Sequence, residues 1–456
     1  MEDSHIANAR PLPLQGNFWE FPLVEKSMGA RAVSLPRSRD GWYLPIGLSL
    51  MALGIALMGR KIYLDPTWPV GTDISVYLSA LKNIAAGLHP YGDVHAHPFA
   101  YPPLFAELLT LLFPFFSDGK WWAVWSALTF VQLIATLIIM MRGFGEKLSW
   151  GAVALICGVI SVSHLTRSEV FHGQADFTIL LLLVLGLRFS TSQRPFATAV
   201  AWSIMMNIKP FLGIVVVHQL VTRRYKEAVY TLIAGGSIFA LSFALFGTEA
   251  IDAFLKWRAS AAWYTSVPEI ARFDNQAFYA FFARVCNATE YGVPLANCQG
   301  AVPFLMIPVF AVALVALVLT ARSVIMLSRA NCLKPVHEML AAGIVIAAIM
   351  ACGPTYYGNY IYLLLPGALG AYLMASNGRD RAGWLVATAI WCVALYSLAL
   401  PISIRLTDTY RWSQLHGLGH LAGIQNGTVA MICAVVSSAL LYRSASRQAR
   451  RGVATG

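Results

Sequence analysis

The chain has 456 residues, of which 57% are hydrophobic and only 12% are charged. Soluble globular domains carry about 25% charged residues, so this composition excludes a soluble globule and indicates an integral membrane protein. The net charge is +11. Because the basic residues are scattered beside apolar segments and form no clustered face, they argue against nucleic acid as a partner.

Apolar stretches near the length of about 20 residues that a bilayer requires recur along the chain. They predict an all-α fold, a polytopic bundle of about 10–12 transmembrane helices. A further apolar stretch between Arg194 and Arg223 is interrupted by Asn207-Ile-Lys-Pro210. The uninterrupted stretches lie at 43–59, 121–141, 150–165, 176–193, 228–247, 301–328, 336–352, 360–376, 383–402 and 424–442.

Basic clusters predict the orientation of these segments, because cytoplasmic loops carry the excess of Lys and Arg. All clusters face the cytoplasm only if residues 195–222 cross the membrane twice, as two half-helices that meet near Lys209-Pro210 at the outer side. Broken helices of this kind are tolerated where they line a cavity or are buried in protein. The clusters are Arg31/Arg37/Arg39, Arg142/Lys147, Arg188/Arg194, Arg223/Arg224/Lys226, Arg322/Arg329/Lys334, Arg379/Arg381 and Arg443/Arg447/Arg450/Arg451.

This orientation divides the chain into three parts. Residues 1–42 are expected to form a disordered cytoplasmic tail, 43–443 the transmembrane domain, and 444–456 a basic cytoplasmic tail. The inner loops are short, whereas the outer loops are long. Functional residues concentrate on loops held by a rigid scaffold, so we expect the site on the outer face. The long outer loops are 60–120, 164–175, 248–300 and 403–423.

The first outer loop contains a carboxylate, Asp73, at the mouth of the membrane. An ionisable group at a bilayer boundary is costly to desolvate and indicates function, although a helix-capping role fits the position equally well. Residues 73–87 have the apolar stripe of an amphipathic helix, expected along the membrane surface. Tyr101-Pro-Pro103 predicts the start of a second helix that runs to about Leu112.

Other outer-face residues favour transfer of a group from an anionic leaving group. A carboxylate can take a proton from an attacking hydroxyl, while cations stabilise the charge left on a phosphate. The cations are Lys209, Arg167, Arg258 and Arg272, and the polar clusters are His172-Gly-Gln-Ala-Asp176, Asp274-Asn-Gln276 and Gly353-Pro-Thr-Tyr-Tyr-Gly-Asn-Tyr360.

Simpler interpretations remain open for each of these residues. Lys209 fits a lysine that snorkels outward, and Arg258 and Arg272 fit anchors at the membrane interface. The segment from His172 to Asp176 fits the end of one helix and the cap of the next. Tyr356, Tyr357 and Tyr360 fit an aromatic belt.

Two cysteines, Cys286 and Cys298, share one outer loop. The outer compartment is expected to be oxidising, so a disulfide between them is an open alternative to free thiols. The other five cysteines lie in or beside apolar segments and fit small core residues. No metal-binding spacing such as CxxC or HExxH occurs in the sequence.

The first outer loop resembles a known family. The string Asp73-Ile-Ser-Val-Tyr77, followed by Gly87-Leu-His-Pro-Tyr91 and Phe99-Ala-Tyr-Pro-Pro-Leu-Phe105, is similar to the corresponding loop of glycosyltransferase family 87, within the GT-C superfamily. Further matches follow in the same order, and the resemblance spans roughly residues 43–370. These matches are Gly173-Gln174, Lys209-Pro210 with the basic cluster after it, and Asp274-Asn-Gln-Ala-Phe278 with Arg284 after it.

This resemblance implies a GT-C-like multi-pass fold in which Asp73 is the catalytic base of an inverting transfer from a lipid-phosphate sugar. It also implies that Lys209, Gln174 and Asn275 face the donor pocket. The family often shows Ser-Pro-x-Ser-Trp-x-His-His, where this chain has the segment 353–360 without either His. Any contact that those His make with the donor phosphate is replaced or lost here.

The sequence therefore predicts a glycosyltransferase that moves a hexose, with mannose expected, from a polyprenyl phosphate to a lipid or glycan hydroxyl. We expect it in the inner membrane, with both termini cytoplasmic and the active site periplasmic. The lipid-phosphate sugar is the co-substrate, and no metal or other cofactor is expected. A secondary transporter or lipid flippase, and a non-catalytic assembly subunit, are the alternatives. The expected site comprises catalytic Asp73, donor or phosphate contacts Lys209, Gln174, Arg272, Arg258, Asn275 and Asn359, and acceptor or pocket residues Tyr77, His89, Tyr91, Tyr101, His172 and Tyr357.

Overall fold

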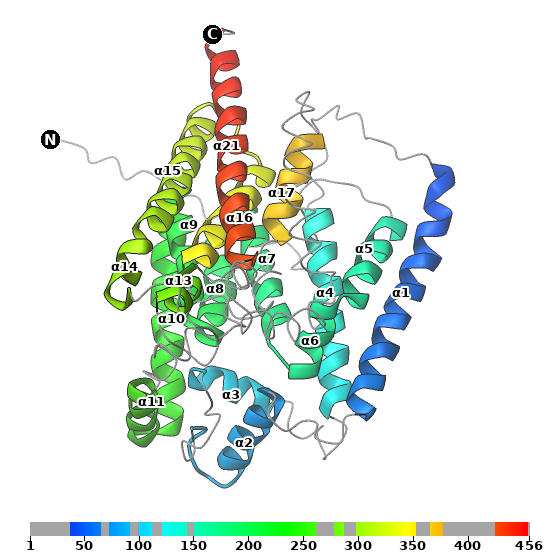
Figure 1. Cartoon of the computed structure of the whole chain (residues 1–456), viewed down its shortest axis with the longest axis vertical. Coiled ribbons are helices and arrows are strands. Elements are labelled where there is room, and N and C mark those ends of the chain that lie inside the picture. The colour runs from blue at the N-terminus through cyan, green and yellow to red at the C-terminus, as the bar shows by residue number, and fades with distance from the viewer. Residues whose placement is uncertain are drawn as a thin grey trace, which may run out of the picture.

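The computed structural model describes most of the apolar segments and part of residues 60–120, the predicted first outer loop (Figure 1). All regular elements in this part of the chain are helical, as the sequence predicts. The described residues are 37–64, 73–91, 99, 101–111, 121–143, 150–260, 278–286, 298–352, 365–376 and 425–454.

Nearly every predicted apolar stretch coincides with a helix; the stretch 383–402 lies outside the described residues. The helices are α1 (Arg37–Leu64), α2 (Asp73–Ala85), α3 (Pro103–Thr110), α4 (Trp121–Gly143), α5 (Trp150–Val162), α6 (His164–His172), α7 (Asp176–Thr191), α8 (Pro195–Ile208), η2 (Pro210–Ile214), α9 (Val215–Val221), α10 (Tyr225–Phe246), α11 (Thr248–Ser260), α13 (Phe278–Cys286), η4 (Gln299–Ala301), α14 (Val302–Leu305), α15 (Ile307–Arg329), α16 (Pro335–Cys352), α17 (Leu365–Ser376) and α21 (Gln425–Ala454).

Four segments are long and apolar enough to cross a membrane: Gly41–Arg60, Tyr225–Phe246, Val302–Arg329 and Pro335–Cys352. Shorter apolar helices accompany them. Large apolar side chains on α10 and α15 are exposed, as expected of lipid-facing helices, whereas α16 is buried along almost its whole length. The protein is therefore a multi-pass membrane protein.

Helix α16 lies at the centre of one half of the bundle, in contact with α15, α17 and α21. Helices α1 and α5 pair at the other side (Figure 1). Gly47 permits this pairing, because a Cβ there would lie 2.2 Å from the backbone of Ala154. Small residues at helix contacts let backbones approach closely, which replaces the hydrophobic driving force that lipid removes.

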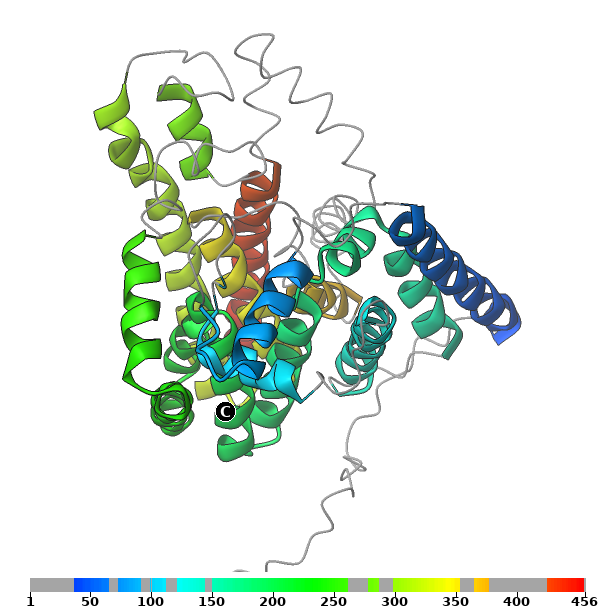
Figure 2. The ribbon, with the colours of Figure 1, turned by 90° about the horizontal axis from the view of Figure 1, so that it is seen from below.

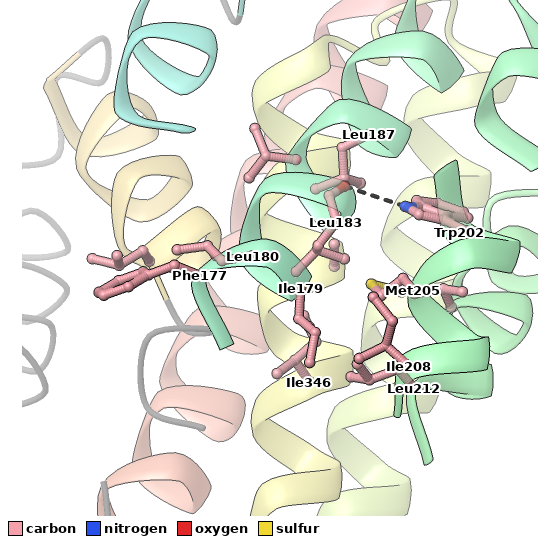
Figure 3. Close-up of a cluster of buried hydrophobic side chains, with 14 of the residues drawn as sticks. Phe177, Ile179, Leu180, Leu183, Leu187, Trp202, Met205, Ile208, Leu212 and Ile346 are labelled. Atoms are coloured by element: carbon pink, nitrogen blue, oxygen red, sulfur yellow. Dashed lines mark hydrogen bonds between the residues drawn. The ribbon is translucent and has the colours of Figure 1, made fainter. Parts of the chain in front are cut away.

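Apolar side chains of α7 and α8 form a buried hydrophobic core (Figure 3). Trp202 of α8 is fully buried, and its Nε1 donates a hydrogen bond to the Leu183 carbonyl of α7 over 3.2 Å. Leu187 of α7 and Met205 of α8 add to this apolar contact, whereas Leu180 lies on the other side of α7, beside Phe177 (Figure 3). The indole hydrogen bond is valuable here, because a buried polar group without a partner is costly.

The segment 195–222 is interrupted at Lys209, between α8 and the short η2 that leads into α9, which confirms the predicted break. Pro210 disfavours a helical conformation at the preceding residue, and Lys209 is extended, with φ −129° and ψ 100°. The return of the chain is visible in two contacts. Trp202 lies beside His218, with ring centroids 5.9 Å apart, and Arg224 donates to the carbonyl of Ser190 over 2.6 Å.

The first outer loop contains the two predicted helices, as α2 and α3. They lie at the end of the bundle opposite the C-terminus (Figure 1), and the view from below shows them across that end (Figure 2). Helix α3 contacts α8 and α10. The apolar side of α2, with Ile74, Tyr77 and Leu81, is buried inside the protein.

Two further features bear on the sequence analysis. Cys286 and Cys298 form a disulfide, which decides the alternative left open above. Helix α21 continues without interruption from the apolar segment into the basic C-terminal region, as far as Ala454.

Candidate active site

Asp73 is the first residue of α2, and Gln174 reaches it from the turn between α6 and α7. The Gln174 side-chain amide donates a hydrogen bond to Asp73 Oδ2. These two residues, predicted from distant parts of the sequence, therefore lie together. Asp73 as a residue remains partly exposed.

A glycine makes this contact possible. Helix α6 is preceded by its N-cap Ser163, whose hydroxyl accepts a hydrogen bond from the Thr166 amide. It is followed by its C-cap Gly173, whose φ of 73° lies in the left-handed region. A Cβ on Gly173 would lie only 1.9 Å from Ile74 Cγ1. Glycine is therefore required twice here, for its backbone conformation and for the close approach of α2.

Lys209 and Asp176 form a buried ion pair beside this contact. Asp176 is the first residue of α7 and is fully buried, while Lys209 is 8% exposed. The end of α8 is held in place by Asn207, whose amide donates to the carbonyls of Ser203 and Gly235 over 2.9 and 3.1 Å. Two charges removed from water require such a precise arrangement, because their desolvation is expensive.

Glu169 of α6 is a third acidic residue in the same cluster. It is 2% exposed, and its carboxyl group shares a hydrogen bond with Asp176. Burial, reinforced by the negative charge of Asp176, raises the pKa of Glu169 well above its usual range. Two carboxyl groups share a hydrogen bond only when one of them carries a proton, and the direction of this shift makes Glu169 the donor.

The electrostatic environment of Asp73 is set by these neighbours. Burial raises the pKa of Asp73 from 3.8 to about 6, against the opposing effects of the Lys209 ammonium and of the Gln174 hydrogen bond, while Asp176 raises it further. The Lys209 ammonium thus acts on the Asp73 carboxylate. The structure brings three of the predicted residues, Asp73, Gln174 and Lys209, into one neighbourhood.

Aromatic residues of the first outer loop pack behind the carboxylate. Tyr77 is fully buried, and its hydroxyl donates to the hydroxyl of Tyr101 over 3.0 Å. Tyr91, also buried, donates to the Tyr101 carbonyl over 3.2 Å. Burial and the Asp73 charge raise the pKa of Tyr101. Tyr101 alone of these three is partly exposed, so it is the one best placed to meet a ligand beside Asp73.

The remaining predicted residues are spread more widely. His89 follows α2 and stacks at 6.2 Å from Tyr91, while His172 is the last residue of α6, next to the Gly173 turn. Arg258 belongs to α11. Arg272, Asn275, Tyr357 and Asn359 lie outside the described residues.

The sequence analysis missed Asp176 and Glu169 as members of the site. Asp176 belongs to the polar cluster 172–176, for which a helix cap was the alternative interpretation, but it was not among the expected site residues, and Glu169 was not considered. Both carried a usable signal, because an acidic residue at the start of an apolar helix or between two such helices needs a partner. The spacing of these residues in the sequence does not show that the partner is Lys209.

Two further observations concern a cavity away from this cluster and the grouping of metal-binding side chains. A small apolar cavity lies between α7, α8, α9 and α16 and is lined by Trp202 and His218 among others. None of the site residues lines it. Among the described residues, no three His, Cys, Asp or Glu side chains are grouped to hold a metal ion.

Comparison with known proteins gives the family. No curated protein matches the chain. The model of glycosyltransferase family 87 matches residues 99–352, more than half of the 456 residues. Gln174, Asp176 and Lys209 lie inside the matched region, whereas Asp73 precedes it. The chain belongs to glycosyltransferase family 87 and is a membrane glycosyltransferase.

Proposed function

We propose that this enzyme transfers a hexose, with mannose expected, from a polyprenyl phosphate to a hydroxyl group of a lipid or glycan. Asp73 is the general base. The observation that carries this assignment is the position of Asp73, a partly exposed residue whose carboxylate is held by Gln174 beside the buried Lys209–Asp176 pair.

The proposed reaction consists of one proton transfer and one displacement at the anomeric carbon. The Asp73 carboxylate accepts the proton of the acceptor hydroxyl, whose oxygen attacks the anomeric carbon on the face opposite the phosphate. The bond from that carbon to the phosphate oxygen breaks, and its electron pair stays on the phosphate. One displacement of this kind inverts the anomeric configuration, and a positioned base contributes about 10²- to 10⁴-fold to such a step.

The pKa of Asp73 suits this role. At about 6, the group is ionised at neutral pH and is still a stronger base than an ordinary aspartate. An ideal general base has a pKa near the working pH. Desolvation, the main cause of the shift, also excludes water that would compete with the acceptor hydroxyl.

Lys209 is assigned to the phosphate of the donor. Its ammonium is held by Asp176, two residues after the Gln174 that binds Asp73, and a cation beside the reacting centre would stabilise the negative charge that remains on the leaving phosphate. Arg272 or Arg258 is expected to assist. In this proposal these side chains neutralise the negative charge of the leaving phosphate, and no metal ion is required.

The donor and the membrane side are inferred from the sequence. The resemblance to polyprenol-phosphate-mannose-dependent enzymes supports the lipid donor and mannose, although the His pair of that family is replaced by Tyr and Asn in 353–360. The basic C-terminal end of α21 lies opposite α2 and α3 (Figure 1). By the excess of Lys and Arg on cytoplasmic segments, this supports an active site on the periplasmic face of the inner membrane.

The test is a donor panel on the purified protein. Polyprenyl-phosphate mannose, polyprenyl-phosphate glucose and a nucleotide-linked mannose are each incubated with a membrane lipid extract, and products are identified by mass and by the anomeric configuration in NMR spectra. We expect a product from a lipid-linked donor with inverted configuration. A product only from the nucleotide-linked donor, or with retained configuration, would contradict the proposal. The family match already favours transfer over the transporter alternative.

A further inference from the structure

The Lys209–Asp176 pair raises a question about charge. Asp176 neutralises much of the lysine charge that the donor phosphate needs, and it is the more deeply buried of the two partners. A buried carboxylate that only weakened phosphate binding would be an expensive feature. Its placement is better explained by what it does to the lysine.

A lysine side chain is a flexible stem with a compact charge at its end. Its ammonium carries three N–H donors, so a bond to Asp176 is compatible with a second bond to a phosphate oxygen. Asp176 is itself held from two sides. It is the first residue of a buried helix, and its carboxyl group shares a hydrogen bond with Glu169.

The Glu169–Asp176 contact joins two buried carboxyl groups, and two carboxyl groups form a hydrogen bond only when one of them carries the proton. Glu169 thus contributes a neutral donor, and Asp176 keeps the single negative charge that faces Lys209. The three side chains come from α6, α7 and the break after α8, so together they fix the ammonium relative to three separate elements.

We propose that Asp176 is a positioning residue for the Lys209 ammonium, and that protonated Glu169 holds Asp176 in place for that purpose. This inference rests on the proposed function only in taking the lipid phosphate as the ligand of Lys209. It goes beyond that function by assigning a role to two acidic residues that do not touch the reacting atoms.

The first experiment measures binding rather than turnover. The purified protein in detergent is titrated with a short-chain polyprenyl phosphate and, as a matched ligand control, with the same polyprenol lacking the phosphate. The ratio of the two dissociation constants reports the phosphate contact alone. A merely structural role of Asp176 would weaken both ligands together and leave this ratio unchanged.

Four proteins form the set: the wild type, Asp176→Asn, Lys209→Met and the double variant. We expect Asp176→Asn to lower the phosphate preference at least tenfold, and we expect the double variant to match Lys209→Met, because Asp176 acts only through the lysine. An unchanged or increased preference in Asp176→Asn would overturn the proposal, since Asp176 would then be neutral or a competitor of the phosphate. Additive losses in the double variant would overturn it as well.

Glu169 supplies a second test that does not depend on removing a charge. Glu169→Gln keeps a neutral N–H donor at this position, whereas Glu169→Leu removes it. We expect the phosphate preference of Glu169→Gln to stay within about twofold of the wild type and that of Glu169→Leu to fall at least fivefold. Equal losses in both variants would contradict a protonated Glu169, and no loss in either would remove Glu169 from the proposal.

The variant Asp73→Asn separates this inference from the proposed function. It should retain the phosphate preference, because the base does not hold the phosphate. If Asp73→Asn also retains turnover, the proposed base is wrong while the positioning role stands. If turnover is lost as expected but Asp176→Asn binds like the wild type, the positioning role is wrong while the proposed base stands.

Discussion

The residues of the site were predicted unevenly. Asp73 and Lys209 stood out as ionisable groups at the ends of apolar segments, and the structure places both in one cluster. Asp176 and Glu169 were missed, because a sequence shows that a buried acid needs a partner but not which one it meets. The Lys209–Asp176 contact joins residues 33 positions apart, and only the folding of α8 against α7 brings them together.

At this scale the account predicts a pH dependence. Asp73 must be ionised to accept a proton, and burial raises its pKa to about 6. Transfer should therefore be low at acidic pH, rise as the pH passes through about 6, and level off above about 7. The measurement is kcat/KM from pH 4.5 to 8, with thermal unfolding at each pH to confirm that the protein stays folded. An acidic limb near pH 4, the value of an exposed aspartate, would contradict the assigned environment.

The elements were predicted more completely than the residue contacts. The lengths of the apolar stretches predicted most of the membrane helices. Asn207-Ile-Lys-Pro210 predicted the break between α8 and η2, because proline disfavours a helical conformation at the residue before it. The burial of the apolar side of α2 inside the protein was not anticipated. An apolar stripe shows that a helix has a face to cover, but it does not distinguish protein from lipid as the cover.

The turn at Gly173 gives a prediction at the scale of elements. In Gly173→Ala the new Cβ would meet Ile74 at 1.9 Å, and the left-handed backbone would cost about 1 kcal/mol in addition. Helix α2 must then move away, which separates Asp73 from Gln174. We expect a loss of turnover of at least tenfold and a lower thermal unfolding midpoint.

Gly236 of α10 is the matched control for this change. A Cβ there meets nothing within 4 Å, and alanine in a helix is favoured over glycine by about 0.5–1 kcal/mol. Gly236→Ala should therefore keep full turnover and unfold at the same or a higher temperature. Equal behaviour of the two variants would show that the contact between α2 and the Gly173 turn does not support the site.

The fold class of the whole molecule was predicted from the sequence, but the packing of its helices against one another was not. Composition and apolar length sufficed for an all-helical membrane protein, and the family match confirms the recognised resemblance. The packing of α16 at the centre and of α1 against α5 at the side depends on small residues such as Gly47. Their spacing in the sequence does not reveal which helices they join.

Orientation in the membrane is a prediction for the whole molecule. Single cysteines are introduced at Leu88, which is exposed after α2, and at Arg447, which is exposed in α21. The background has Cys157, Cys332, Cys352, Cys392 and Cys433 replaced by serine. A membrane-impermeant maleimide should label Leu88→Cys in intact cells and Arg447→Cys only after permeabilisation. The reverse pattern would place the site on the cytoplasmic side and contradict the outward-facing assignment.

The most direct test of the account is sugar transfer by Asp73→Asn. Asparagine keeps the size and the hydrogen-bonding capacity of the side chain but cannot take a proton, and Glu249→Gln, an exposed acid at the start of α11, is the matched control. With a polyprenyl-phosphate hexose as donor, the account predicts that Asp73→Asn lowers kcat at least about 100-fold with donor binding intact, while Glu249→Gln keeps wild-type turnover. Transfer by Asp73→Asn at a rate close to that of the wild type would contradict Asp73 as the base.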